Sequence, residues 1–507
     1  MLIDVSRALP IPLTAQVASS LRSAISSGVL RPGDEVPSTR VLAGQAGVSR
    51  GTIVAAYDQL VSEGYLTATQ GAPTRVNPSL PAVGSRHASP SARCGDFSSV
   101  DSAGNAVGDL TETGAGHRAP RPTGRAASPI SLKPSSGHAG AIRPAAWRQA
   151  WREAAADPAT VTESTGQVEL RNALAEHLRT GRGMRVDREN IVVSGGTREG
   201  LMLVLMAIGG GKPLRIGVED PGHPGLRKII PLAGHAVVPC SVDDAGIAVQ
   251  DLPHVLPHAL PEALPDTRPD ALPDNLDAVI VTPSFQYPLG ASMPAARRRE
   301  LLDWATTTGT VVIEDDFNAE LRYRTAPLPP LAALETTAHV VTLGTFSTQL
   351  NRSVAAGYVA TTSPLAHDLR RTRAMLGMPV SAVTQLAIAH LLRNGHVRRN
   401  TKAVHNRLAR RRDVIAARII PQLAVHGASV TEMAESNGVD LAVTFPDSSA
   451  RDDFARDLRQ HGIEAGRLDT LWSGRDDGLI LSFAHLSEPD FERVCRELEA
   501  MSHPAHP

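Results

Sequence analysis

Residues 344–350 read Gly-Thr-Phe-Ser-Thr-Gln-Leu, and they directly follow the apolar run His-Val-Val-Thr-Leu at 339–343. A short apolar run that ends at a glycine is typical of a buried β-strand, so we expect a strand over residues 339–343. Between about residues 134 and 368, short apolar runs of this kind alternate with amphipathic helical segments. Such alternation predicts an α/β fold, with a mostly parallel sheet and helices on both faces. The other expected strands lie at 191–193, 215–218, 278–281 and 310–313.

Each expected strand is followed by polar residues and glycines. In open parallel sheets, ligands bind beyond the carboxyl ends of the strands. The stretch that contains Gly196 and Thr197 also opens a helix, whose free N–H groups suit a phosphate. Each stretch alone is more often a turn or a helix cap, but several at one sheet edge predict a pocket. The stretches are 194–197, 219–222, 282–290, 314–317 and 344–347.

The first 77 residues predict a separate helical unit. Apolar positions at helical spacing indicate three helices, separated by Gly28 and Gly47, and a two-stranded hairpin is expected at 65–76. Ser38 and Ser49 stand where the N-caps of the second and third helices are expected. This order describes a winged helix-turn-helix, in which the third helix enters the major groove of DNA.

The predicted DNA contacts lie on the second and third helices and on the hairpin. Arg50 and Thr52 would reach bases or phosphates, whereas Arg40 and Arg75 would bind phosphates. Six arginines against five carboxylates give residues 1–77 a net charge of only +1, so a dimer on two half-sites is expected. The alternative is a small packing module in which Arg50 is a solvated charge. The full predicted set is Ser38, Arg40, Ser49, Arg50, Thr52, Tyr57 and Arg75.

Composition narrows the class of protein. The chain has 507 residues, a formal net charge of −1 and an apolar fraction of 42%, which predict several domains and no whole-chain attraction to nucleic acid or membrane. Its three cysteines lack metal-ligand spacing, and no apolar run reaches the ~18 residues of a membrane span. We therefore expect a cytoplasmic protein without a metal site or membrane contact. Residues 78–130 are rich in Ser, Ala, Gly, Pro and Arg, which predicts a flexible linker.

Two family resemblances rest on these motifs. The N-terminal segment resembles the GntR family of bacterial regulators, through Gly-Asp-Glu-Val-Pro-Ser-Thr-Arg at 33–40 and Val-Ser-Arg-Gly-Thr at 48–52. The order of the strand-end motifs resembles fold-type-I aminotransferases, specifically the MocR-type subfamily, in which such a domain follows a GntR head. The resemblance implies a winged helix-turn-helix domain at 9–77, the linker at 78–130, and large and small aminotransferase-like domains at 131–368 and 369–507.

The same resemblance implies a pyridoxal phosphate site. Asp315 would pair with the pyridine nitrogen of the cofactor, and Thr197 and Ser347 would cradle its phosphate. We interpret this region as a degenerate ligand pocket with no catalytic residue. Its predicted members are Gly196, Thr197, Gln286, Asp315, Phe317, Ser347 and Thr348.

The departures from the family pattern fall on the chemistry of this site. The residue after Gly-Thr-Phe-Ser is a lysine in the family but Thr348 here, and a hydroxyl cannot form an imine with an aldehyde. Phe317, Ala355 and Phe285 replace a tyrosine, an arginine and a histidine of the family. Each lost charge-assisted hydrogen bond costs about 1.5–3 kcal/mol. We therefore expect no covalently bound cofactor, and non-covalent binding of pyridoxal phosphate is left open.

The sequence as a whole predicts a DNA-binding transcriptional regulator. We expect a homodimer on double-stranded operator DNA, with a catalytically inactive aminotransferase-like domain that senses a small molecule, either amino-acid-like or phosphorylated. The alternative is a functional pyridoxal-phosphate-binding regulator or aminotransferase that carries a DNA-binding head. In a third interpretation the large domain needs no ligand and serves only for dimerisation.

Overall fold

The structure is a computed structural model of the chain. The predicted linker lies almost wholly outside the residues that it describes, as do 254–274, which contain most of a Leu-Pro repeat. The described residues are 5, 13–26, 29–62, 65–68, 73–78, 129–134, 142–157, 160–161, 163–253, 275–317, 319–321, 329–334, 336–350, 352–430, 440–473 and 477–502.

An eight-stranded sheet forms the centre of the large domain. The strands follow the order β4-β11-β10-β9-β8-β5-β6-β7, and all are parallel except β11 and β7. The predicted α/β fold with a mostly parallel sheet is therefore confirmed. The strands are β4 Ile191–Ser194, β5 Arg215–Asp220, β6 Ala236–Asp243, β7 Gly246–Ile247, β8 Ala278–Val281, β9 Val311–Asp315, β10 Val340–Thr345 and β11 Gly357–Thr361.

Helices cover both faces of this sheet. Successive strand residues alternate between two apolar cores: Val279 and Val281 belong to one, and Ala278 and Ile280 to the other. The first core is closed by α4, α5, α8 and α10, and the second by α6, α7 and α9. The helices are α4 Pro144–Ala154, α5 Val168–Arg182, α6 Thr197–Gly209, α7 Pro224–Leu232, α8 Ala295–Thr308, α9 Leu365–Leu376 and α10 Ala382–Arg393.

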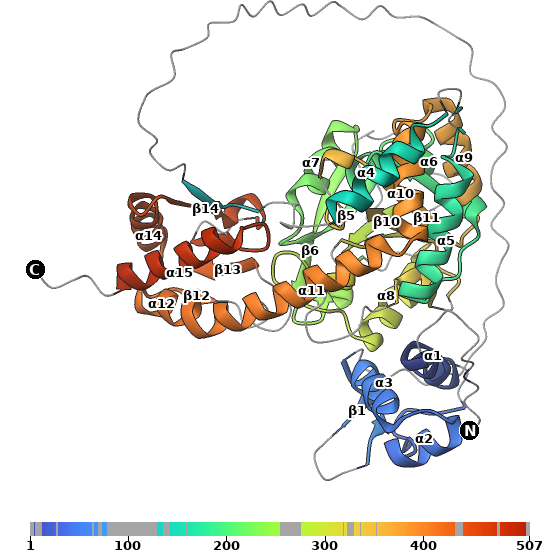
Figure 1. Cartoon of the computed structure of the whole chain (residues 1–507), viewed down its shortest axis with the longest axis horizontal. Coiled ribbons are helices and arrows are strands. Elements are labelled where there is room, and N and C mark those ends of the chain that lie inside the picture. The colour runs from blue at the N-terminus through green and yellow to red at the C-terminus, as the bar shows by residue number, and fades with distance from the viewer. Residues whose placement is uncertain are drawn as a thin grey trace, which may run out of the picture.

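The small domain packs its own helices on a five-stranded sheet of order β12-β13-β15-β14-β3. Figure 1 shows it beside the large domain, with α11 running from one to the other. Its strands are β3 Ile130–Leu132, β12 Ser429–Val430, β13 Asp440–Thr444, β14 Ile463–Arg467 and β15 Gly478–Ser482. Its helices are α11 His396–Val414, α12 Ile420–Val425, α14 Ser448–Gln460 and α15 Glu488–Ser502.

Two predicted domain boundaries differ from the structure. The boundary at 368/369 falls inside α9, and both α9 and α10 pack in the cores of the large domain. The change of core occurs along α11, where Val397 belongs to the large domain and Leu408 to the small one. Residues 131–132, predicted to open the large domain, belong to β3, which pairs in parallel with β14 of the small domain. The pairing of β3 with β14 joins segments far apart in sequence, which leave no local signal.

The N-terminal unit, called the head below, consists of residues 13–76. Ser38 caps α2, Gly47 ends it with a φ of 63°, and the antiparallel pair β1–β2 forms the wing. Its core includes Val17, Leu21 and Leu60, which are fully buried. This arrangement confirms the predicted three helices and hairpin. The elements are α1 Leu13–Ser26, α2 Thr39–Ala46, α3 Arg50–Ser62, β1 Leu66–Thr67 and β2 Arg75–Val76.

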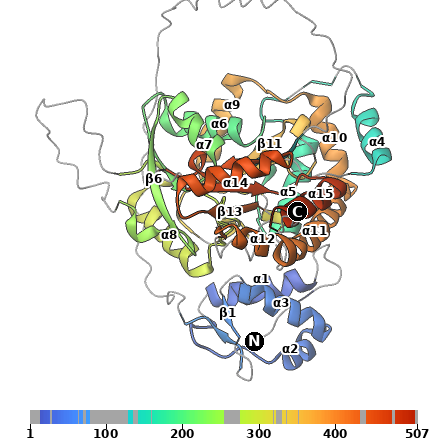
Figure 2. The same cartoon turned by 90° about the vertical axis from the view of Figure 1, so that its left-hand side faces the viewer.

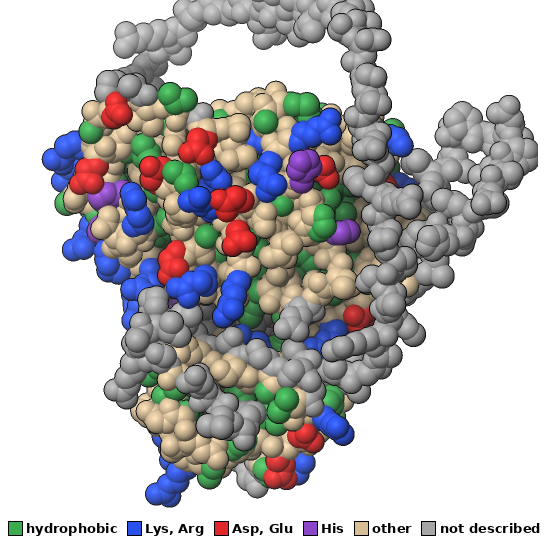
Figure 3. All heavy atoms as spheres, turned by 90° about the vertical axis from the view of Figure 1, so that its right-hand side faces the viewer, with side chains coloured by type: hydrophobic (Ala, Val, Ile, Leu, Met, Phe, Trp, Pro, Cys, Tyr) green, Lys and Arg blue, Asp and Glu red, His purple; other side chains and the backbone are tan. Residues whose placement is uncertain are grey.

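Figures 1 and 2 both show the head below the large domain, near α8, with α2 further from the large domain than α1 and α3. On the face shown in Figure 3, Lys and Arg side chains are interspersed with Asp and Glu, in keeping with the small net charge. Among the described helices, none combines the length and the apolar character needed to cross a membrane.

Candidate functional site

Carboxyl ends of the parallel strands meet at one edge of the large sheet. Leu343 of β10 lies opposite Asp315 of β9, and Gly357 of β11 lies opposite both Thr345 and Ser194. The loops that follow β4, β9 and β10 are therefore neighbours. This edge, called the cleft below, brings together the strand-end stretches that the sequence indicated.

The loop between β4 and α6 has the shape of an anion-binding turn, but the chain itself already supplies an anion. Gly196 has a φ of 107°, and Thr197 is the first residue of α6. The backbone N–H of Gly195 donates to Glu199 Oε2 at 2.9 Å, and the buried Arg373 of α9 pairs with Glu199 Oε1. This carboxylate therefore occupies a backbone amide that a phosphate would otherwise use.

The loop after β10 carries the residues that decide covalent chemistry. The hydroxyl of Thr345 accepts from the backbone N–H of Ser347 at 3.1 Å and donates to Ser347 Oγ at 3.1 Å. Thr348 follows and is buried, with an exposed fraction of 7%. Thr348 therefore places a short hydroxyl side chain, and no amine, in the interior of the large domain.

Asp315, at the end of β9, is the most unusual carboxyl group of the cleft. Its exposed fraction is 4%, and its Oδ1 has no hydrogen-bond partner among the described residues. Burial, reinforced by the nearby carboxylates of Asp316 and Glu219, raises the pKa of Asp315 to about 8. The carboxyl group is therefore largely protonated at neutral pH and can donate a hydrogen bond to a ligand.

The neighbouring carboxylate, that of Asp316, has both oxygens occupied by an ion pair. Asp316 forms a two-pronged ion pair with Arg182 of α5, in which Nη2 donates to Oδ1 at 2.8 Å. Close by, His177 of α5 contacts Glu320 at 2.7 Å between Nε2 and Oε1. These pairs anchor α5 to the segment that follows β9, so Asp315 is the carboxyl group left for a ligand.

A second buried carboxyl group supports the loop after β8. Glu219 Oε1 accepts from the backbone N–H of Thr282 at 3.2 Å, and its Oε2 accepts from the Thr282 hydroxyl. Burial raises the pKa of Glu219 to about 7 despite these hydrogen bonds. Gln286 is also committed to the loop, because its Nε2 donates to the carbonyls of Pro221 at 2.7 Å and Tyr287 at 3.0 Å. The predicted pocket residue Gln286 therefore shapes the loop.

Four rings gather at the same edge. Phe317 meets the rings of Tyr287, His223 and Phe285, with centroid distances of 5.9, 6.1 and 6.4 Å. His223 follows β5 and accepts from the Gly225 N–H through Nδ1 at 3.1 Å. Burial, and secondarily the charge of Arg198, lowers the pKa of His223 to about 4, so the ring is neutral. The cleft thus offers flat apolar surfaces beside an uncharged carboxyl group.

On the head, the predicted DNA-contact residues divide into two groups. Arg40 and Arg50 are exposed, and Ser49 caps α3 by accepting from the Thr52 N–H at 3.1 Å. Arg75 is exposed as well, but it pairs with Glu35 and donates to the carbonyl of Gly33 at 3.1 Å. Its charge is therefore partly neutralised within the wing.

Tyr57 does not fit the DNA contact that was predicted for it. Its exposed fraction is 4%, and its hydroxyl donates to the carbonyl of Pro37 at 2.5 Å. Burial raises the pKa of Tyr57 to about 12. The residue joins α3 to the segment before α2, so its role is structural.

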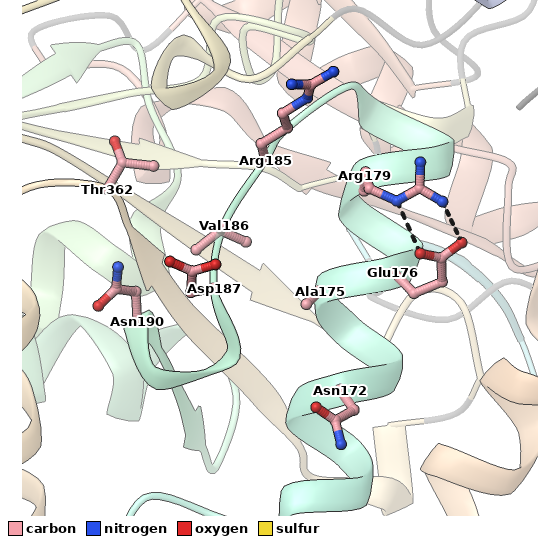
Figure 4. Close-up of a pocket in the computed structure, with 9 residues that line it drawn as sticks. All are labelled: Asn172, Ala175, Glu176, Arg179, Arg185, Val186, Asp187, Asn190 and Thr362. Atoms are coloured by element: carbon pink, nitrogen blue, oxygen red, sulfur yellow. Dashed lines mark hydrogen bonds and ion pairs between the residues drawn. The ribbon is translucent and has the colours of Figure 1, made fainter. Parts of the chain in front are cut away.

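A separate hollow of about 590 Å³ lies at the opposite edge of the sheet. Figure 4 shows Arg179 and Glu176 of α5 turned toward each other there, and their side chains meet at 2.7 Å. These two charges are used within the helix. The hollow contains none of the predicted pocket residues. Its lining consists of Asn172, Ala175, Glu176, Arg179, Arg185, Val186, Asp187, Asn190 and Thr362.

The cleft residues fit only part of pyridoxal phosphate. The free Oδ1 of Asp315 and the surrounding rings suit a pyridine ring. Thr348 offers no amine for the aldehyde, and Phe317 offers no hydroxyl for the phenolic oxygen. Glu199 disfavours the phosphate. No catalytic step through that cofactor follows from these residues.

Sequence reasoning missed three residues of this site. Glu199 lies two residues after the predicted Thr197, and His223 follows directly on the stretch 219–222. Glu219 was quoted within that stretch but received no role of its own. Their positions beside the motifs were a usable signal, whereas their ion pair, ring contacts and pKa shifts depend on packing.

Two family models match the chain in succession. Residues 13–76 match the model described as "Bacterial regulatory proteins, gntR family", and residues 135–498 match "Aminotransferase class I and II". Among solved structures, an aminotransferase from Mycobacterium tuberculosis superposes with a TM-score of 0.61 at 18% identity, covering 74% of this chain and 91% of that one. That likeness establishes the fold of the second part.

Curated relatives share the whole arrangement. The HTH-type pyridoxine biosynthesis transcriptional regulator PdxR of Corynebacterium glutamicum is 35% identical over 98% of each chain. The probable rhizopine catabolism regulatory protein MocR of Rhizobium meliloti is 28% identical, over 80% of this chain and 77% of its own. Regulators with a gntR-type head bind DNA, and the aminotransferase fold usually binds pyridoxal phosphate. The chain therefore belongs to the MocR-type subfamily of gntR-family transcriptional regulators, in which a winged helix-turn-helix head precedes an aminotransferase-like domain.

Proposed function

We propose that this protein is a DNA-binding transcriptional regulator whose aminotransferase-like domain senses a small molecule and catalyses no transamination. The observation that supports the proposal is Thr348, which is buried and follows Gly-Thr-Phe-Ser, the motif after which the family resemblance implies a lysine. Its hydroxyl cannot bond covalently to an aldehyde as an amine does. All four lysines of the chain, Lys133, Lys212, Lys228 and Lys402, are exposed, so none supplies a buried amine in its place.

DNA binding is assigned to the head. Arg50 begins α3, the helix expected in the major groove, and Arg40 lies on α2 beside it. Both side chains are exposed, whereas Arg75 is held by Glu35. Because residues 1–77 carry a net charge of only +1, a single head attracts DNA weakly, which favours a homodimer that places two heads on two half-sites.

The effector is assigned to the cleft. A protonated Asp315 with a free oxygen can donate to a ring nitrogen or to a carbonyl oxygen. The rings of Tyr287 and Phe317 provide a surface for a flat ligand. The sequence indicated either an amino-acid-like or a phosphorylated effector. Glu199 disfavours the phosphorylated one, because it already accepts from the Gly195 N–H. We therefore favour a small, unphosphorylated, non-covalently bound ligand.

A DNA gel-retardation assay and a borohydride-reduction assay with pyridoxal phosphate test the proposal together. The full-length protein should retard DNA from upstream of its own gene. After incubation with pyridoxal phosphate and reduction with borohydride, its mass should be unchanged. A stable pyridoxyl adduct on a cleft residue would favour the alternative, a working pyridoxal-phosphate enzyme with a DNA-binding head. Failure to retard any DNA would remove the regulator itself.

The third interpretation, a large domain that serves only for dimerisation, needs a different measurement. A ligand that binds only the native state stabilises it by RT ln(1 + [L]/Kd), so the melting temperature rises with the logarithm of the ligand concentration once that exceeds the dissociation constant. Screening amino acids and pyridine derivatives by thermal shift should identify at least one such compound. A shift that is lost in Asp315→Leu would place the ligand in the cleft.

A further inference from the structure

The core of the head includes a residue of the large domain. Ala295, the first residue of α8, has an exposed fraction of 4% and belongs to the same apolar cluster as Val17 and Leu60. Ala296 packs against this cluster as well. Figures 1 and 2 show α1 and α3 on the side of the head that faces the large domain. The first turn of α8 thus packs against the core of the head.

Hydrogen bonds connect the start of α8 to the loop that follows β8. Arg298 of α8 is buried, and its guanidinium donates to the carbonyls of Pro283 at 3.0 Å and Met293 at 2.9 Å. Those two residues stand near the two ends of the loop, and Met293 N–H also donates to Pro283 O at 2.9 Å. The loop and the start of α8 therefore form one hydrogen-bonded unit.

The other end of this unit lies in the cleft. The loop carries Phe285 and Tyr287, whose rings contact Phe317 at centroid distances of 6.4 and 5.9 Å. We expect a flat ligand that stacks on these rings to change their packing, because the rings already contact one another in a close-packed group. Arg298 thus connects this loop to α8, the helix that begins at Ala295.

We propose that the first turn of α8 is a docking site for the DNA-binding head and that the state of the cleft controls its occupancy. Ligand binding then changes the ratio of docked to released heads, as a ligand with different affinity for the two states must do. The inference rests on the proposed sensor function, and it adds the route by which the sensor reaches the head. The physical requirement is an element with two arrangements that both sites bias, and α8 with its loop is that element.

A distance measurement on the full-length chain tests the docking site. Spin or fluorescent labels on Gly44→Cys of the head and Lys212→Cys of the large domain report the distance between the two domains, and both positions are exposed. The chain also carries Cys94→Ser, whereas Cys240 and Cys495 are buried and are left in place. The parent chain should give one narrow distance. Ala295→Arg should lower the docked-to-released ratio at least tenfold, while Thr307→Arg, exposed on the last turn of α8, should leave it unchanged. An unaltered distance in Ala295→Arg overturns the docking site. If that variant fails to fold, Ala296→Glu at the half-buried neighbour serves in the same way.

The coupling is tested by perturbing the cleft alone. Phe317→Ala removes the ring that Phe285 and Tyr287 contact, and it should shift the docked-to-released ratio although Phe317 is absent from the head's apolar cluster. A ratio equal to that of the parent chain overturns the coupling. DNA retardation by the same samples reports separately on the proposed function. If the parent chain retards no DNA, the proposed regulator function is wrong. If the parent chain retards DNA but Phe317→Ala leaves the docked-to-released ratio unchanged, only this inference is wrong.

Discussion

Gly344 of β10 lies directly opposite Tyr358 of β11, and the tyrosine ring packs against the backbone where a side chain would be. A methyl group added at Gly344 would lie 2.1 Å from Tyr358 Cζ. Tyr358 is itself buried, with an exposed fraction of 7%, so the ring cannot move away into solvent. The glycine that begins the motif at 344–350 is thus required by the neighbouring strand.

Gly344→Ala should destabilise the large domain. Overpacking of a close-packed interior typically costs about 1–3 kcal/mol, and thermal unfolding of the purified chain measures the loss. Gly181→Ala on α5 is the matched control, because its methyl group would meet only His177 Cε1 at 4.0 Å. That control should be neutral or slightly stabilising, since alanine suits a helix better than glycine. Equal melting temperatures for Gly344→Ala and the parent chain would contradict the packing argument.

Thr348→Lys should restore covalent capture. A lysine at this buried position would supply an amine in the domain where Asp315 and the rings of Tyr287 and Phe317 are proposed to bind a flat ligand. After addition of pyridoxal phosphate and borohydride, we expect a stable pyridoxyl group on residue 348, detected by peptide mass spectrometry. Thr348→Met, of similar length but without an amine, is the control and should gain no mass. Absence of the adduct in the lysine variant would mean that the cleft does not accept the ring.

Asp315 should make stability fall as pH rises. Its pKa in the folded protein is about 8 against a usual 3.8, so between these values the folded state holds a proton that the unfolded chain has lost. Stability therefore declines through this window and the loss is complete above the folded pKa. Asp315→Asn keeps a neutral side chain at every pH, and its melting temperature relative to the parent should increase between about pH 5 and pH 8.

The control for this pH dependence is Asp251→Asn, because Asp251 is exposed. Its melting-temperature difference from the parent chain should be the same at both pH values. A constant difference for Asp315→Asn as well would show that the carboxyl group is ionised in the folded protein.

Arg50→Ala should abolish DNA retardation while the oligomeric state, measured by light scattering, stays that of the parent. Arg50 is exposed at the start of α3, and its Nε donates only a long 3.4 Å bond to Thr39 Oγ1, so its removal leaves the fold intact. Arg50→Lys keeps the charge but loses the planar fork that reads bases and phosphates. That variant should retain non-specific binding and lose sequence preference. Unchanged operator affinity in Arg50→Ala would mean that α3 does not enter the groove.

Tyr57→Phe should weaken the fold of the head without a direct effect on DNA. The substitution removes the hydrogen bond to Pro37 O, and such a bond contributes about 0.5–1.5 kcal/mol. Thermal unfolding should show a lower first transition, while operator affinity well below that temperature stays at the parent value. A large loss of affinity in a fully folded variant would restore the DNA contact that the sequence indicated.

Local pattern alone determined the three helices and hairpin of the head and five strands of the large sheet, but not β6, β7 or β11. The strand expected at 339–343 is β10, extended to Thr345, and the capping residues Ser38 and Gly47 delimit α2 as expected. These features depend on neighbours within a few residues, because periodicity and backbone conformation are local. The motif at 344–350 also fixed the identity of Thr348, and with it the absence of an amine.

Packing between distant segments decided the rest. Strand β3 joins β14 across more than three hundred residues, and Ala295 lies in the core of the head, yet the sequence near neither position indicates its distant partner. The neutral state of Asp315 has the same origin, since burial and adjacent carboxylates set its pKa. Sequence records which groups the chain possesses, but only the folded arrangement sets the distances and the solvent access that govern their chemistry.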